Sequence, residues 1–177
     1  FNEKGADELI VLDIDATRKS LSPNFNLIKK LAAECRMPLC YGGGVNSAEF
    51  ASQLVDMGVE KVAVSSAAIT NPNLINEMTS AVGRQSVVVV IDFNKKKNFF
   101  SNEYELCSHN GKKSYKEDPF VFLKKCQEAG AGEIVINSVN QDGIMQGYDL
   151  NLALKVKMIA KIPITFLGGA GSLQDME

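Results

Sequence analysis

The 177-residue sequence predicts an α/β fold, because short apolar segments alternate about six times with amphipathic ones. A second observation is an internal repeat. PLCYGGGVNS, which starts at Pro38, returns as PITFLGGAGS from Pro163, about 125 residues later, and GADELIV from Gly5 matches GAGEIVI from Gly130 at the same separation. Two copies of about 125 residues give the usual length of a (β/α)8 barrel, about 250 residues. The sequence therefore predicts a (β/α)8 TIM barrel with a two-fold repeat, incomplete here, with about six βα units.

We expect residues 1–177 to form one barrel domain, with 1–129 as the first repeat half and 130–177 as part of the second. A doubly wound open sheet would fit the alternation alone, and the repeated glycine loops favour the barrel. The chain begins at Phe1 in mid-pattern, so we expect a piece of a longer protein. Two absent strands would leave open edges beside 9–14 and 162–167, and self-association through those edges is the second possibility.

The predicted strands are nearly continuous apolar runs, as in parallel strands that are buried on both faces. They are residues 9–14, 38–41, 61–65, 86–93, 133–138 and 162–167. The predicted helices are 26–35, 47–57, 72–82, 118–129 and 151–160, with Asn71 as N-cap and Pro72 at the first helical position of the third. Residues 95–115 break the alternation and predict two short strands around an Asn110-Gly111 turn.

Composition excludes several classes of protein. The net charge of −2 gives no basic surface for nucleic acid, and the apolar runs are too short to cross a bilayer. The four cysteines and the one histidine lack metal-ligand spacing, so we expect no metal, no cofactor and no disulfide, but buried thiols in a reducing cytosol.

Polar residues follow the predicted strands, at the end where barrel enzymes build their active sites. They are Asp13, Asp15, Gly42–Gly44, Ser65, Ser66, Asp92, Asp142 and Gly168–Gly171. An aspartate in such a place is more often a helix cap than a catalyst. Asp92 is the better candidate for acid–base chemistry, because five apolar residues precede it and restricted water raises a carboxyl pKa toward a useful range.

The two glycine loops, at 42–44 and 168–171, could each hold a phosphate on backbone N–H groups. Their repetition indicates an elongated substrate with a phosphate at each end, although tight turns without a ligand would show the same glycines. Glu8, Lys61 and Glu133 lie at the other end of the strands, where charge commonly serves solubility alone. His109, in the polar excursion, is expected to be solvated rather than catalytic.

These motifs together resemble one family. GADELIVLDIDAT, PLCYGGGVNS, KVAVSSAA, VVVVIDF, GAGEIVINSVNQDGIMQGYD and ITFLGGAGS are similar to the HisF family, the cyclase subunit of imidazole glycerol phosphate synthase. The resemblance implies a subunit that takes ammonia from a glutaminase (glutamine amidotransferase) partner. It would close an imidazole ring on a bisphosphorylated ribulosyl substrate, releasing imidazole glycerol phosphate and an aminoimidazole carboxamide ribotide.

The resemblance also implies roles for residues. Asp92 matches the catalytic acid/base, and Asp142 matches the acidic residue after the barrel's sixth strand. The matched phosphate sites are Gly44, Ser65 and Ser66 on one side and Gly143, Gly168 and Gly169 on the other. Asp13 and Asp15 are expected on the substrate side because they follow a strand. Glu8, Lys61 and Glu133 match the charged gate through which ammonia enters the barrel.

Two departures from the family pattern leave the substrate open. The family usually has Asn-Thr at Ser65-Ser66 and Ser at Leu167, and LDIDAT and LGGAG look more like a paralogous branch linked to amidination of surface-polysaccharide sugars. That branch would use ammonia on a sugar acceptor. A phosphoribosyl isomerase relative is a related alternative, but the charged residues at the barrel bottom and the GYD after Asp142 argue against it. A non-catalytic phosphate-binding module is an alternative of a different class.

Overall fold

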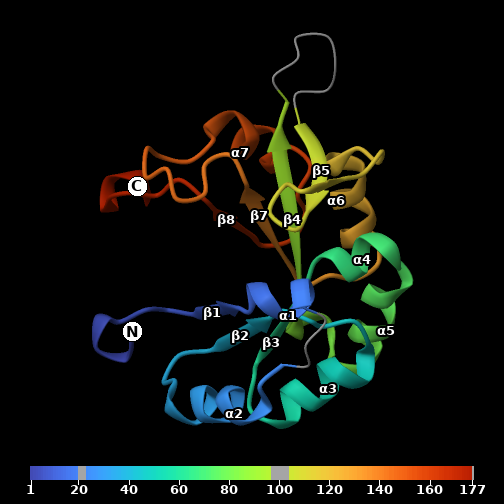
Figure 1. Cartoon of the computed structure of the whole chain (residues 1–177), viewed down its shortest axis with the longest axis vertical. Helices are drawn as coiled ribbons and strands as arrows, with labels where there is room; N and C mark the ends of the chain where they lie inside the picture. The colour runs from blue at the N-terminus through green and yellow to red at the C-terminus, as the bar shows by residue number, and fades with distance from the viewer. Residues whose placement is uncertain (20–22, 97–103, 177) are drawn as a thin grey trace. The chain divides into compact units, whose positions relative to one another are not determined.

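The computed structural model describes residues 1–19, 23–96 and 104–176 (Figure 1). The chain divides into two compact units. The first contains Phe1–Val88 and Ala129–Gly132, and the second contains Val89–Glu128 and Glu133–Glu177. Strands and helices alternate in both, which confirms the predicted α/β class.

The first unit is built on the parallel strands β1 (Leu9–Leu12), β2 (Leu39–Gly42) and β3 (Lys61–Val64). β1 pairs with β2 and β2 with β3, with Tyr41 opposite both Val11 and Val62. The helices are α1 (Ile14–Lys19), α2 (Phe25–Glu34), α3 (Ala48–Asp56), α4 (Ser66–Thr70) and α5 (Asn73–Val82), with 3-10 turns at Asn2–Lys4 and Arg84–Ser86. α3 packs on α5 and on β3, and this packing buries the apolar faces of the helices.

The second unit is organised around β4 (Val87–Lys95), which has β5 (Tyr104–Ser108) on one side and β7 (Glu133–Ser138) on the other (Figure 1). β5 is antiparallel to β4 and to the two-residue β6 (Lys113–Ser114), whereas β7 is parallel to β8 (Ile164–Leu167). The helices are α6 (Pro119–Glu128) and α7 (Leu150–Lys157), followed by the 3-10 turn Leu173–Met176.

The excursion over 95–115 folds as predicted where it is described, with residues 97–103 outside the described part. β5 and β6 form a hairpin whose turn holds His109, Asn110 and Gly111 in left-handed backbone conformations, with φ of 55°, 58° and 78°. The rings of Phe93, Tyr104 and Phe120 meet edge to face at centroid distances of 5.3–6.2 Å. These contacts attach the hairpin to β4 and α6.

One predicted helix start was wrong in detail. α5 begins at Asn73 with Pro72 as its N-cap, one position outside the helix, and Asn71 ends a separate short helix, α4. The Asn71 N–H donates to the Ala67 carbonyl, so this residue closes α4 instead of capping α5 through its side chain. A second helix that we did not predict, α1, starts directly after β1 at Ile14.

The four cysteines are all free thiols, and three of them are buried. Within the described residues, no helix is both long and apolar enough to span a membrane.

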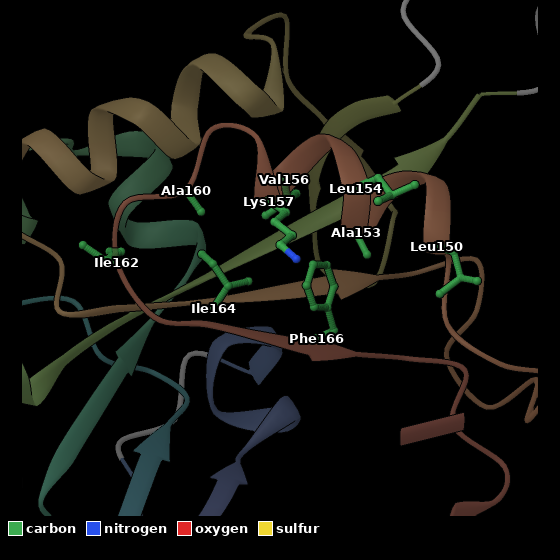
Figure 2. Close-up of a pocket in the computed structure, with 9 residues that line it drawn as sticks. All are labelled: Leu150, Ala153, Leu154, Val156, Lys157, Ala160, Ile162, Ile164 and Phe166. Carbon is green, nitrogen blue, oxygen red and sulfur yellow. The ribbon is translucent and has the colours of Figure 1, made fainter. Parts of the chain in front are cut away.

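An apolar groove of about 530 Å³ lies between α7 and β8 (Figure 2). Leu150, Ala153 and Leu154 of the helix face Ile164 and Phe166 of the strand across it. Ile164 and Phe166 lie on the opposite face of β8 from Thr165, whose hydroxyl bonds Glu133, since side chains alternate along a strand. Leu154 is 63% exposed, so this part of the second unit is accessible to solvent. The predicted self-association stays a prediction.

Gly132 provides a test of the first unit's packing. Its N–H donates to the Val87 carbonyl at 3.0 Å, and an added Cβ would overlap the Arg84 backbone carbonyl. Because backbone would have to move, we expect Gly132→Ala to lower the free energy of unfolding by roughly 3 kcal/mol, at the top of the range for overpacking. Chemical denaturation of the variant measures this loss.

The matched control is Gly5→Ala, at a position where a Cβ would meet nothing within 4 Å. It carries only the cost of a left-handed backbone at φ 67°, about 1–2 kcal/mol. Equal losses in the two variants would contradict the packing described for Gly132.

Candidate active site

Polar groups gather at the carboxyl ends of β1 and β2 in the first unit. The Asp13 N–H donates to the Gly42 carbonyl at 2.7 Å, and the Asp13 carboxylate accepts from the N–H groups of Asp15 and Ala16. Asp13 is therefore the N-terminal cap of α1, and Asp15 lies in the first turn of that helix. An aspartate that directly follows a strand is more often a helix cap than a catalyst, and Asp13 is such a cap.

The glycine loop after β2 lies against Asp13. Gly43 has φ 126°, and a Cβ there would come within 2.5 Å of the Asp13 carbonyl, so only glycine fits. The register pairs Gly42 with Ala63, so Gly44 and Ser65 leave the parallel sheet at the same level. Ser66 begins α4 directly after Ser65. The three residues of the first predicted phosphate site therefore follow neighbouring strands of this unit, and their role stays a prediction.

Tyr41 is a buried phenol that sequence reasoning missed. Burial raises its pKa to about 12, helped by the negative charge of Asp13 and by a hydrogen bond to that carboxylate. The phenol of Tyr41 is thus a third partner of the Asp13 carboxylate, beside the N–H groups of Asp15 and Ala16. A tyrosine in a strand of otherwise small and aliphatic residues was the available signal.

Asp92 is the most deeply buried of the predicted catalytic carboxylates, with 8% of its surface exposed. It is the sixth residue of β4, after five buried apolar positions. Its Oδ1 accepts a hydrogen bond of 2.9 Å from the Asn137 amide on β7. Burial is the largest effect and raises the pKa of Asp92. The hydrogen bond from Asn137 and the charge of His109 lower this pKa, and the charge of Asp142 raises it.

Asp142 and the second glycine loop also belong to this unit. The Asp142 N–H donates to the Ser138 carbonyl, and its side chain is exposed. Gly168 lies so close that a Cβ would approach the Ser138 carbonyl to 2.8 Å and the Asp142 nitrogen to 3.3 Å. Gly143, with φ 74°, is open to solvent. The structure therefore gathers Asp92, Asp142 and Gly168 around the carboxyl ends of β4, β7 and β8.

The predicted gate residues lie at the amino ends of their strands. In the first unit, Lys61 Nζ and Glu8 Oε2 form a salt bridge of 2.7 Å, and Glu8 Oε1 is buried without a hydrogen-bond partner among the described atoms. In the second unit, Glu133 is 8% exposed and accepts from the Thr165 hydroxyl at 2.6 Å. A charge that serves solubility lies on the surface, whereas the Glu133 carboxylate is buried. Its burial therefore favours a role for Glu133 other than surface charge.

Two further residues interact with Asp92 but were not predicted from the sequence to belong to the site. His109 is exposed, as predicted, yet its charge acts on Asp92 from the hairpin turn. Asn137 makes the one direct side-chain bond to the Asp92 carboxylate among the described residues. An amide near the end of an apolar strand was the signal for Asn137. Elsewhere too, the described part of the chain holds no group of side chains suited to bind a metal ion.

Comparison with known proteins agrees with the resemblance. The profile of the histidine biosynthesis protein family matches residues 1–177. A protein of Leptospira interrogans with the provisional name imidazole glycerol phosphate synthase subunit HisF is 52% identical over 177 residues, all of this chain and 69% of that protein. The imidazole glycerol phosphate synthase subunit HisF of Petrotoga mobilis is 38% identical over 175 residues, 99% of this chain and 69% of that protein.

Parallel strands that carry glycine loops and carboxylates at their carboxyl ends define the scaffold of a barrel-type α/β enzyme. The chain belongs to the histidine biosynthesis protein family, and within it to the HisF cyclase subunits and their paralogues. This membership confirms the predicted fold class, a (β/α)8 barrel that is represented in the described residues by β1 to β4, β7 and β8.

The raised pKa of Tyr41 predicts how stability depends on pH. A group whose pKa is higher in the folded state stabilises the fold fully below its unfolded pKa, about 10 for tyrosine, and less as the pH rises through its folded value. The Tyr41 contribution should therefore fall between about pH 10 and the folded value, about 12. Denaturation curves of wild type and Tyr41→Phe measure it.

We expect Tyr41→Phe to be less stable at neutral pH and to lose stability less steeply at alkaline pH. Tyr148→Phe, which alters a partly exposed phenol, is the control and should follow the wild type. Parallel curves for Tyr41→Phe and wild type up to pH 12 would contradict the described environment of Tyr41.

Proposed function

We propose that this protein is a HisF-type cyclase subunit that uses ammonia from a glutaminase partner to close an imidazole ring on a bisphosphorylated ribulosyl substrate. The products would be imidazole glycerol phosphate and an aminoimidazole carboxamide ribotide. The observation that carries the proposal is Asp92, whose burial raises the pKa of its carboxyl above the usual range, the direction that favours general acid–base catalysis.

The remaining roles follow the same proposal. Asp142 would be the second carboxylate, and the glycine loops would bind the two phosphates through backbone N–H groups. The phosphate sites are Gly44, Ser65 and Ser66 at one end and Gly143, Gly168 and Gly169 at the other. Glu8, Lys61 and Glu133 would form the ammonia gate facing the partner, and the salt bridge between Glu8 and Lys61 supports a defined arrangement there.

A second candidate function is the ammonia-dependent amidination of a surface-polysaccharide sugar. The observation that favours it is Leu167, which pairs with Asn137 in register and is 38% exposed at the carboxyl end of β8. An isobutyl group offers no hydroxyl to a phosphate. A sugar acceptor that lacks a phosphate at this position would suit Leu167 better than the ribulosyl substrate does.

An assay of the full-length protein separates the two functions. The ribulosyl bisphosphate with an ammonium salt should give imidazole glycerol phosphate, detected by chromatography and mass spectrometry. Turnover of a sugar acceptor in the presence of the amidotransferase partner, without turnover of the ribulosyl substrate, would favour the second function. Phosphate binding with neither reaction would indicate a non-catalytic module.

Asp92→Asn tests the proposed acid/base directly. Asparagine keeps the size of the side chain but cannot exchange a proton, so we expect kcat to fall by roughly 10²–10⁴-fold. Stability should not fall at neutral pH. A carboxyl group whose folded pKa is raised favours the fold below its unfolded pKa and opposes it once the pH exceeds the folded value.

The control is Asp56→Asn, which replaces an exposed aspartate at the end of α3 and should leave kcat unchanged. A rate near the wild-type value in Asp92→Asn would reduce Asp92 to a structural residue.

A further inference from the structure

Asn137 lies within β7, so the strand sets the position of its backbone. It is the fifth residue of that strand, which lies between β4 and β8. Because side chains alternate along a strand, Asn137 shares a face with Val135 and Glu133. Its amide nitrogen donates to Asp92 Oδ1 at 2.9 Å, so one half of the amide is committed to the carboxylate.

The other half of the amide has no partner among the described residues. Asn137 Oδ1 is buried, and no described group donates a hydrogen bond to it. Its neighbour in register on β8 is Leu167, whose side chain has no donor. A buried acceptor without a donor destabilises the fold, so it calls for an explanation. A hydrogen bond from a molecule bound in the site is the explanation that the position of Asn137 beside Asp92 favours.

We propose that Asn137 is a positioning and specificity residue, which orients the Asp92 carboxylate through its amide N–H and accepts a hydrogen bond from an N–H or O–H of the substrate through its amide oxygen. The proposal rests on the proposed function, since it takes Asp92 as the group that exchanges the proton. The substrate group would carry a donor at or beside the reacting atom, and an amine or a hydroxyl meets that requirement.

The proton accounting is simple. Asp92 begins as the carboxylate and takes a proton from the reacting atom of the substrate, a different hydrogen from the one that Asn137 accepts. Asp92 later returns this proton, and Asn137 exchanges none. The amide N–H stabilises the carboxylate form, and the amide oxygen holds the substrate donor beside it. Two other titratable groups act on the Asp92 pKa, His109 from the hairpin turn and Asp142 from the loop after β7. The Cys107 thiol on β5 also lies near Asp92, whose charge helps to raise the Cys107 pKa.

The donor half is tested by the titration of Asp92 and, as a second readout, by the pH dependence of kcat/KM. In full-length protein with ¹³C-labelled aspartate carboxyls, NMR titration follows Asp92, identified by its absence in Asp92→Asn. Asn137→Leu removes the donor that favours the carboxylate, so we expect the Asp92 pKa to rise, and the limb of the kcat/KM pH profile that reports Asp92 to move the same way.

The matched control is Asn94→Leu. It removes a similar amide–carboxylate bond, from Asn94 to Glu105 at 2.7 Å, two residues further along β4. The control should leave the Asp92 pKa unchanged. An unchanged Asp92 pKa in Asn137→Leu, or an equal shift in both variants, overturns the donor half. If Asn137→Leu fails to fold, Asn137→Ala removes the same amide.

The acceptor half is tested by binding. Calorimetry with the ribulosyl bisphosphate, without ammonia, should show roughly tenfold weaker binding to Asn137→Leu, the effect of one lost hydrogen bond. Asn137→Asp keeps an oxygen at this position and should bind more tightly than Asn137→Leu. Equal binding by Asn137→Leu and wild type overturns the acceptor half. Wild-type protein that binds no such substrate overturns the proposed function together with the acceptor half, whereas the titration still decides the donor half.

Discussion

The burial of β4 is the constraint on which the rest of the site depends. Val87–Phe93 is buried without interruption, and Asp92 is the one ionisable side chain in that stretch. Water is thereby kept from the carboxylate, and its pKa is raised. The Asn137 amide partly offsets the loss of hydration and fixes the direction of the carboxylate. A fold that restricts water around one carboxylate gains a group suited to proton transfer and gives up some stability at neutral pH.

Most of the features that the sequence predicted correctly are strands, and the turns or loops at the ends of strands. The β7 bounds, the hairpin over the excursion and the glycine loops were predicted because each depends on residues adjacent in sequence. The start of α5 was not, since Asn71 and Pro72 fit either the end of one helix or the start of the next. Propensity alone does not decide between those two roles.

The partners of the candidate site residues could not be predicted. Tyr41 with Asp13 and Asn137 with Asp92 are contacts between neighbouring strands, and each depends on a register that a single sequence does not encode locally. The resemblance assigned roles to residues that match a family motif, and neither Tyr41 nor Asn137 is among them. Asn137, whose Oδ1 is buried, pairs in register with Leu167 on β8.

The most direct measurement is a crystal structure of the full-length Asp92→Asn variant with the bisphosphorylated ribulosyl substrate bound. We expect one phosphate on Gly44, Ser65 and Ser66, the other on Gly143, Gly168 and Gly169, and a reacting atom of the substrate about 2.6–3.2 Å from the side chain of residue 92. A substrate bound elsewhere, for example in the groove between α7 and β8, with residue 92 out of its reach, would contradict the proposed role of Asp92.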